Sequence, residues 1–186
     1  MVDPHISSPL IWKEEDTTRV LIGKILSSKS YTRGAVERIL QKAWNLQSGF
    51  DVIEVKGNAF MFKFVHLEEY NRILRGRPWS INGCILNLME RSKFKTCEEF
   101  DFSCCPMWIQ IHNVPMEALC VENAIMIGGY VVEVVLAEDP HYKDRYLHNF
   151  LRVRVILDLR KTLASGFWMS KPNSSRFWIS IRYEKL

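Results

Sequence analysis

Residues Asn58 to Arg91 read NAFMFKFVHLEEYNRILRGRPWSINGCILNLMER, and this stretch decides the fold of the chain. At its start, Phe60, Phe62 and Phe64 alternate with residues of other kinds. Successive side chains of a strand point to opposite faces of a sheet, so the three rings share one face. The alternation predicts a strand that buries a ridge of phenylalanines.

A short amphipathic helix is expected after this strand. Glu68 and Glu69 fall in its first turn, where acidic groups complement the positive end of the helix dipole. Arg72 and Arg75 fall in its last turn, and Gly76 just beyond them is a typical helix stop. We therefore predict a helix that ends before Gly76.

The flanking segments complete one unit. Asn82-Gly83 lies between two apolar runs and predicts a hairpin, because both residues of such a turn must accept positive φ. Val20 to Leu26 and Val52 to Lys56 are typical of strands, and a helix with apolar residues at helical spacing runs from Thr32. This order predicts that residues 18–91 form a four-stranded antiparallel sheet with two helices on one face, the βαββαβ sandwich of ferredoxin-like and RNA-recognition-motif (RRM) proteins. The residues expected to be buried together are Ile39, Trp44, Phe60, Phe62 and Phe64.

The rest of the chain predicts a lead-in, a connector and a second unit. Residues 1–17 form a polar lead-in, and residues 92–106 show no clear period and are expected to connect two halves. Residues 107–186 predict a second, smaller α+β unit with an antiparallel sheet. Its expected elements are strands at 107–112, 130–137 and 150–157, a helix at 116–127, and a hairpin of 166–169 with 176–183 around Lys171-Pro172-Asn173.

The composition sets broad limits on function. The chain has 186 residues, of which 47% are hydrophobic, enough for one core or two small ones. A net charge of +4 and a pI near 8.8 permit an anionic partner without requiring one. The start lacks a secretory signal, and no segment approaches the roughly 20 apolar residues of a membrane helix. Five cysteines, an odd number with two adjacent, favour free thiols and an intracellular location in the nucleus or cytoplasm.

Several short segments occur in an order and spacing typical of one family, although none is a sharp motif alone. They are Leu21-Ile22-Gly23-Lys24-Ile25-Leu26, Ala43-Trp44, Phe60-Met61-Phe62-Lys63-Phe64, Gly76-Arg77-Pro78-Trp79, Trp108-Ile109-Gln110-Ile111-His112-Asn113-Val114-Pro115, Ile127-Gly128-Gly129, Arg152-Val153-Arg154-Val155 and Tyr183-Glu184-Lys185-Leu186. On these segments, which cover the chain from about Thr18 onward, the sequence resembles a plant domain-of-unknown-function family found in proteins similar to the first open-reading-frame product of LINE retrotransposons.

The resemblance implies an RRM-like fold and single-stranded nucleic-acid binding in a retroelement particle. Proteins of this kind usually continue, after a segment like Tyr183-Glu184-Lys185-Leu186, into a zinc knuckle with Cys-Cys-His-Cys ligands. The sequence ends at this segment, so a truncated copy or a fragment is expected. Zinc and knuckle-based binding are therefore not expected of these residues.

The first unit is not expected to stack bases. RRM proteins use two or three aromatic rings on their central strands for this purpose. Lys56 to Phe64 superficially matches the RNP1 pattern, but the strand register buries its three phenylalanines. The opposite face would then expose Ala59, Met61 and Lys63, none of which carries a ring that can stack.

The second unit offers basic and aromatic groups at alternating strand positions. If their faces coincide, arginines would bind phosphates and tryptophans would stack on bases. The residues of this predicted surface are Trp108, Gln110, His112, Arg152, Arg154, Arg176, Trp178 and Arg182. A second basic cluster comprises Lys24, Lys29, Arg33, Arg38 and Lys42. The alternatives are a solvated outer sheet face for the first set and a solvated helix face for the second.

No motif points to catalysis or to a metal. Gly23-Lys24 lacks the upstream glycine of a phosphate-binding loop, and Cys104-Cys105 lacks metal-ligand spacing. We therefore expect no enzyme, no cofactor, no membrane partner and no small-molecule substrate. The function predicted is a non-catalytic module for single-stranded nucleic acid, with RNA favoured. The alternative is a protein-interaction or self-assembly module, for which a homo-oligomer is the expected assembly, with little nucleic-acid affinity of its own.

Overall fold

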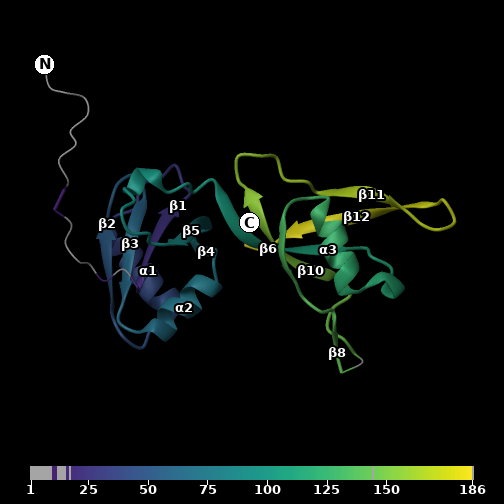
Figure 1. The fold of residues 1–186 in the computed structure, drawn as a ribbon, viewed down its shortest axis with the longest axis horizontal. Helices are drawn as coiled ribbons and strands as arrows, with labels where there is room; N and C mark the ends of the chain where they lie inside the picture. Colours follow the sequence, from purple (N-terminus) through teal and green to yellow (C-terminus); the bar gives the residue numbers. More distant parts are fainter. Residues whose placement is uncertain (1–9, 12–15, 17, 144, 186) are drawn as a thin grey trace, which may run out of the picture.

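A computed structural model describes residues 10–11, 16, 18–143 and 145–185 of the chain. Two α+β units lie side by side along the long axis of the molecule (Figure 1). Most of the predicted polar lead-in, at residues 1–9, 12–15 and 17, lies outside the described residues.

The first unit has the predicted βαββαβ order with one additional short strand. Its elements are β1 (Val20–Ile25), α1 (Arg33–Trp44), β2 (Phe50–Glu54), β3 (Ala59–Phe64), α2 (Leu67–Arg75), β4 (Trp79–Ile81) and β5 (Cys84–Glu90). Every pair of neighbouring strands is antiparallel, in the order β2-β3-β1-β5-β4. The sheet has five strands rather than the predicted four, because β4 pairs with β5 as a hairpin. Asn82 and Gly83 in its turn have φ of 50° and 79°, as the hairpin prediction required.

The core of this unit is the predicted aromatic ridge. Phe60 and Phe62 are completely buried, and the ring of Phe62 meets that of Trp44 edge-on at 5.3 Å between centroids. Trp44 ends helix α1, so the ridge packs beneath the helical layer. Ile39, which was expected in the same buried group, is only partly buried and packs at its margin.

The opposite face of the first sheet, which we call the outer face, is covered by the connector. Ile22 and Asn87 point to this face and are completely buried. Asn87 donates both amide hydrogens to connector and β6 carbonyl oxygens, at 3.0 Å to Phe102 and 2.9 Å to Cys104. The expectation that Ala59 is exposed here was wrong, since it is 6% exposed. The connector thus occupies the surface that RRM proteins use for bases.

The second unit repeats the strand order of the first. Its elements are β6 (Cys104–His112), α3 (Val121–Gly129), β7 (Val134–Ala137), β8 (His141–Tyr142), β9 (Arg145–Tyr146), β10 (Leu151–Asp158), β11 (Gly166–Ser170) and β12 (Arg176–Tyr183). The sheet order β11-β12-β6-β10-β7 matches β4-β5-β1-β3-β2 of the first unit, strand for strand along the chain. An irregular connection, residues 159–165, stands where the first unit has helix α2. The second unit is therefore an RRM-like sandwich with one helix.

Several boundaries predicted in this unit needed correction. Strand β6 begins at Cys104, inside the predicted connector. The helix predicted at 116–127 runs from Val121 to Gly129, after a short 3-10 turn at Met116–Ala118, and so continues through the glycines where a stop was expected. A Cβ atom at Gly128 would come within 2.9 Å of Val134 and 3.2 Å of Val153. Gly128 therefore lies inside the helix because it allows close helix–sheet packing. As a result β7 begins at Val134, later than the predicted residue 130.

Replacing Phe62 by alanine is predicted to lower the free energy of unfolding by about 3–5 kcal/mol, because a completely buried ring would leave a cavity. Urea denaturation followed by circular dichroism measures this change. Lys63→Ala, at the exposed neighbouring position, is the matched control and should change stability by less than about 0.5 kcal/mol. Equal effects of the two substitutions would contradict the predicted core.

Candidate nucleic-acid interface

The second sheet has an outer face on the side opposite α3. In β6, β10 and β12, alternate residues are buried under α3, and the residues between them point outward. The strand register places Arg154 beside Trp108, Arg152 beside Gln110, and Gln110 beside Arg182. The outward residues of these strands include all eight of the predicted surface, which are Trp108, Gln110, His112, Arg152, Arg154, Arg176, Trp178 and Arg182. The structure therefore brings this predicted set onto one face.

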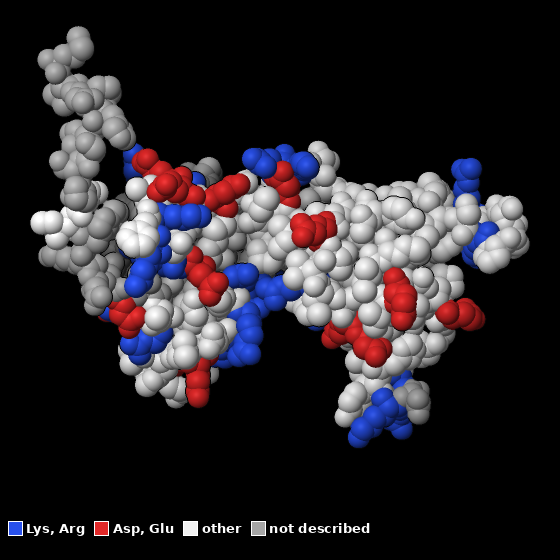
Figure 2. Space-filling model, viewed as in Figure 1, with Lys and Arg blue, Asp and Glu red and all other residues white. Residues whose placement is uncertain are grey.

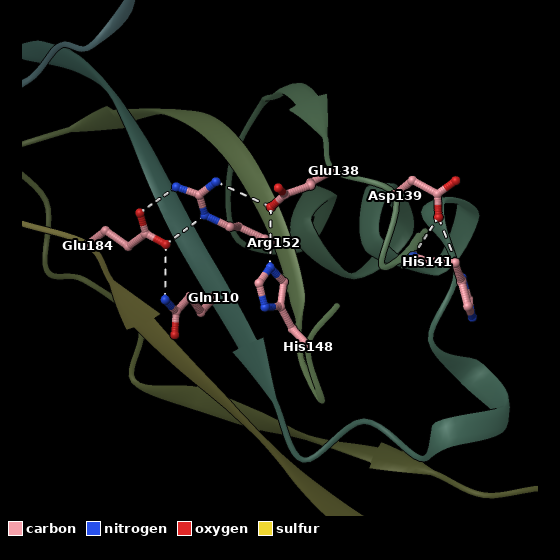
Figure 3. Close-up of polar contacts among 7 residues, drawn as sticks. All are labelled: Gln110, Glu138, Asp139, His141, His148, Arg152 and Glu184. Atoms are coloured by element: carbon pink, nitrogen blue, oxygen red, sulfur yellow. Dashed lines mark hydrogen bonds and ion pairs between the residues drawn. The ribbon is translucent and has the colours of Figure 1, made fainter. Parts of the chain in front are cut away.

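Arg152 is held at the centre of this face by the chain's own carboxylates (Figure 3). Its Nε and one terminal nitrogen donate to the two oxygens of Glu184, each at 2.8 Å, and another nitrogen donates to Glu138 at 3.2 Å. The guanidinium also lies 4.2 Å from the ring centroid of Trp108. These bonds to Glu184 raise the pKa of Arg152 and lower the pKa of Glu184. Arg152 lies on the predicted face, but its charge is already paired.

A chain of hydrogen bonds continues from this ion pair to His112. Gln110 donates from Nε2 to Glu184 at 3.0 Å, so its Oε1 accepts from Nε2 of His112 at 2.9 Å. Burial, and then the nearby charge of Arg182, lower the pKa of His112. The imidazole ring lies 4.8 Å from Phe150, whose ring stacks on His148 at 4.6 Å. Flat rings therefore extend along this edge of the face.

Arg154 is used to join the two units. Its two terminal nitrogens donate to the carbonyl oxygens of Arg75 and Arg77, at 3.0 and 3.1 Å. The ammonium group of Lys185 donates to the carbonyl oxygens of Gly76 and Pro78, at 2.9 and 2.8 Å. Four consecutive carbonyl oxygens at the end of α2 thus accept hydrogen bonds from two cationic side chains of the second unit. Burial lowers the pKa of both Arg154 and Lys185.

The hairpin end of the face carries the most exposed aromatic pair. Trp168 and Trp178 are cross-strand neighbours, with ring centroids 5.4 Å apart and exposures of 62% and 37%. Arg176 and Arg182 on the same strand as Trp178 are exposed, and neither forms an ion pair within the described part of the chain. This part of the face is open for a ligand. Trp168 was not among the predicted surface residues, although its pairing with Trp178 follows from the predicted hairpin.

The second predicted basic cluster is not brought together. Lys24 pairs with Ala59 and Asn87 and so points to the outer face of the first sheet, away from α1. Arg38 and Lys42 lie on α1 and line a shallow groove with Ala35, Ile39 and Ala43. Lys29 precedes this helix and Arg33 begins it. The prediction of one five-residue surface was therefore wrong, because the sheet separates Lys24 from the helix face.

Other kinds of site find no support in the described residues. No group of three or more His, Cys, Asp or Glu side chains among them could hold a metal ion. None of the described helices is long and apolar enough to cross a membrane. The five cysteines are free thiols, and burial raises the pKa of Cys105 to about 11.

Comparison with known proteins gives a family match for the first unit. Residues 13–99 contain a domain that matches the family described as "Domain of unknown function (DUF4283)". No curated protein matches the sequence. Among solved structures, the chain is similar to the crystal structure of the first two RRM domains of yeast poly(U) binding protein (Pub1), with 10% sequence identity and a TM-score of 0.31. That match covers 89% of this chain and 99% of the other chain.

The ion pair of Arg152 and Glu184 predicts a pH dependence of stability. The pKa of Glu184 is lowered in the folded protein, so its stabilising contribution is present above the ordinary glutamate pKa of 4.5. That contribution is lost as the pH falls from there through the lower, folded-state pKa. Melting temperatures measured from neutral pH to about pH 3 should therefore fall less steeply for Glu184→Gln than for the parent.

Glu117→Gln is the matched control, since this exposed carboxylate forms no ion pair within the described residues. Its acid profile should run parallel to that of the parent. If the Glu184→Gln profile is also parallel to the parent, the ion pair contributes nothing measurable to stability.

Proposed function

We propose that the chain is a non-catalytic module that binds single-stranded nucleic acid through the outer face of the second sheet. The observation that carries this proposal is the combination, on the face opposite α3, of exposed indoles and of arginines that form no ion pair with any described residue. Trp168 and Trp178 supply flat surfaces, and Arg176 and Arg182 supply positive charge beside them. Single-strand binding proteins combine these two kinds of group to stack bases and neutralise phosphates.

The position of this surface in the fold supports the proposal. In RRM proteins the sheet face opposite the helices binds the nucleic acid. In the first unit the connector covers this face and is held there by hydrogen bonds from Asn87. In the second unit the same face carries Trp178 and Arg182, which are exposed to solvent. The proposed division of roles is that the first unit supports and the second unit binds.

The internal contacts refine the role of each predicted residue. Trp178 is proposed to stack on a base, and Arg182 to contact a phosphate. Arg152, with Glu184 on one side and Trp108 beneath, is proposed to keep the centre of the face rigid. Arg154 is proposed to position the second unit against the first. The rings of His112 and Phe150 offer a further flat surface beside Arg182.

The origin of the chain is also a proposal. The sequence resemblance described above and the DUF4283 match of residues 13–99 support descent from a plant retroelement protein of the LINE type. Such a protein would package or escort single-stranded RNA, and the free cysteines suit a reducing intracellular compartment.

Trp178→Ala is predicted to weaken binding to a single-stranded RNA by about 1–3 kcal/mol, because a stacked ring is lost. Its dependence on salt should match the parent, because no charge changes. Arg182→Gln should weaken binding to all sequences and reduce the salt slope by about one unit. Fluorescence anisotropy over a salt series measures both effects.

Tyr130→Ala is the matched control for Trp178→Ala, since Tyr130 is an exposed ring that ends α3 on the other side of the sheet. It should bind RNA like the parent. The proposal fails if the parent shows no binding at physiological salt, or if folded Trp178→Ala and Arg182→Gln both bind as the parent does.

A second candidate function, protein interaction, is favoured by a groove on the helix side of the second unit. The groove has a volume of about 540 Å³ and is lined by Tyr130, Val131, Ala164, Gly166, Phe167, Trp168 and Met169. It lies beside the irregular connection that replaces a second helix, and Tyr130 is 70% exposed there. Apolar surface left open in this way is typical of association sites.

If this groove mediates self-assembly, the parent protein should form dimers or larger species whose fraction rises with concentration. Tyr130→Asp should then shift the protein to monomer, because a charge would enter the apolar contact. Sedimentation velocity at several concentrations measures this shift, with Tyr142→Asp, another exposed ring, as the control. A parent that stays monomeric at all concentrations would exclude self-assembly through the groove.

A further inference from the structure

Three cations gather where the two units meet, and we call this cluster the seam. It comprises the side chains of Arg77 from the first unit and of Arg154 and Lys185 from the second. The side chain of the neighbouring Arg75 lies elsewhere, because its Nε donates to the carbonyl oxygen of Asn71. Figure 2 shows Lys and Arg atoms gathered at the waist between the two lobes. Burial, and then the charge of Arg77, lower the pKa of Arg154. Burial also lowers the pKa of Lys185, and the charge of Arg154 lowers it further, as expected for cations that lie close together.

Within residues 18–143 and 145–185, none of the three seam side chains forms an ion pair with a carboxylate. Arg154 and Lys185 donate to backbone carbonyl oxygens, which carry no net charge. Nε of Arg77 is buried and has no hydrogen-bond partner among these residues. The nearest carboxylate in sequence, Glu184, is bound to Arg152, and its charge offsets only part of the effect of burial on Lys185.

Like charges held together and partly withdrawn from water repel one another. An anion that bridges them removes this repulsion and gains charge-assisted hydrogen bonds. Arginine side chains are well suited to phosphate, since the planar guanidinium donates two parallel hydrogen bonds to its oxygens. The chemistry of the seam therefore selects a phosphate group or a phosphodiester.

The seam continues the outer face of the second sheet. Strand β12 leads from Trp178 to Tyr183, and Glu184 and Lys185 follow directly, so the path from the indole to the seam is about 20 Å long at roughly 3.3 Å per residue. Trp108 lies between, with Arg152 4.2 Å and Arg154 6.0 Å from its ring centroid. A stacked single strand with a phosphate about every 3.4 Å would cover this path with about six nucleotides.

We propose that the seam is a phosphate-binding site for the backbone of the same single strand whose bases stack at Trp178. This proposal rests on the proposed function. The complete site then needs both units, because Arg77 belongs to the first and Trp178 to the second. The first unit contributes to binding through Arg77, which follows α2, although its sheet face is closed.

A purely structural role for the seam makes a different prediction. The clamp between the units uses the carbonyl oxygens of Arg75 and Arg77 and the side chains of Arg154 and Lys185. Replacing the side chain of Arg77 leaves these carbonyl oxygens in place. That side chain therefore tests phosphate binding without removing the clamp.

The experiment compares the parent with Arg77→Gln, using a labelled single-stranded RNA of about twelve nucleotides in about 50 to 200 mM salt. This variant should lose about 0.7 of a unit of salt slope and bind about fivefold more weakly near 0.1 M salt, because one single-strand phosphate contact contributes a slope of about −0.7. Arg77→Lys keeps the charge and should retain most of the slope. Melting temperatures verify that each variant is folded.

Arg75→Gln is the matched control, because it removes one exposed arginine charge whose guanidinium donates to the carbonyl oxygen of Asn71 and lies outside the seam. An unchanged slope in the seam variant, or an equal loss in the control, overturns the seam proposal. If Trp178→Ala still weakens binding in that case, the proposed function stands without the seam. If the parent binds no RNA, the proposed function fails and the seam proposal fails with it.

Discussion

Arg154 and Lys185 bind four consecutive carbonyl oxygens, from Arg75 to Pro78, at the end of helix α2. The last carbonyl groups of a helix lack partners within the helix and carry the negative end of its dipole. Cations from the second unit satisfy them here, so the helix end and the second sheet are fixed to each other. Because these cations follow or belong to β12 and β10, one end of the second sheet faces the first unit and the other end, at Trp178, remains open.

The two units share one strand order, but the sheet face opposite the helices is covered in the first unit and exposed in the second. In the first unit, the connector crosses this face and Asn87 binds two carbonyl oxygens of the returning chain. In the second unit, the same face holds Arg152 between two carboxylates at its centre. It leaves Arg182 exposed in the same cross-strand row and Trp178 exposed at the hairpin end. A tandem of similar folds can thus contain one unit that supports and one that binds.

Local patterns in the sequence were sufficient for much of the fold. The alternation of Phe60, Phe62 and Phe64 predicted the buried ridge, and Asn82-Gly83 predicted the hairpin, because each depends on neighbouring residues only. Gly128 was misread as a helix stop, since its actual role is contact with Val134 and Val153, and Val153 lies 25 positions further along the chain. The closure of the first sheet was also missed, because Asn87 gives no sign of its partners 15 and 17 residues away.

In the candidate site, too, local sequence patterns predicted some features, while contacts between distant residues determined the others. Strand alternation correctly placed Arg152, Arg154 and Trp178 on one face, as strand periodicity requires. It could not show that Glu184, 32 residues from Arg152, neutralises its charge, or that Arg154 reaches a carbonyl oxygen 79 residues away. Partners of this kind are set by the packing of whole units. The sequence therefore identified the face, and the structure identified which of its groups remain free.

The central claim is that single-stranded nucleic acid meets the second sheet and the seam, and not the first sheet. Amide chemical-shift mapping by NMR, with a single-stranded RNA titrated into the isotope-labelled chain, tests this most directly. The account predicts shifts along β12 and β6 around Trp178, Arg182 and His112, continuing to the residues after Arg75. Shifts confined to the outer face of the first sheet around Met61 and Lys63, or to α1 around Arg38, would contradict it.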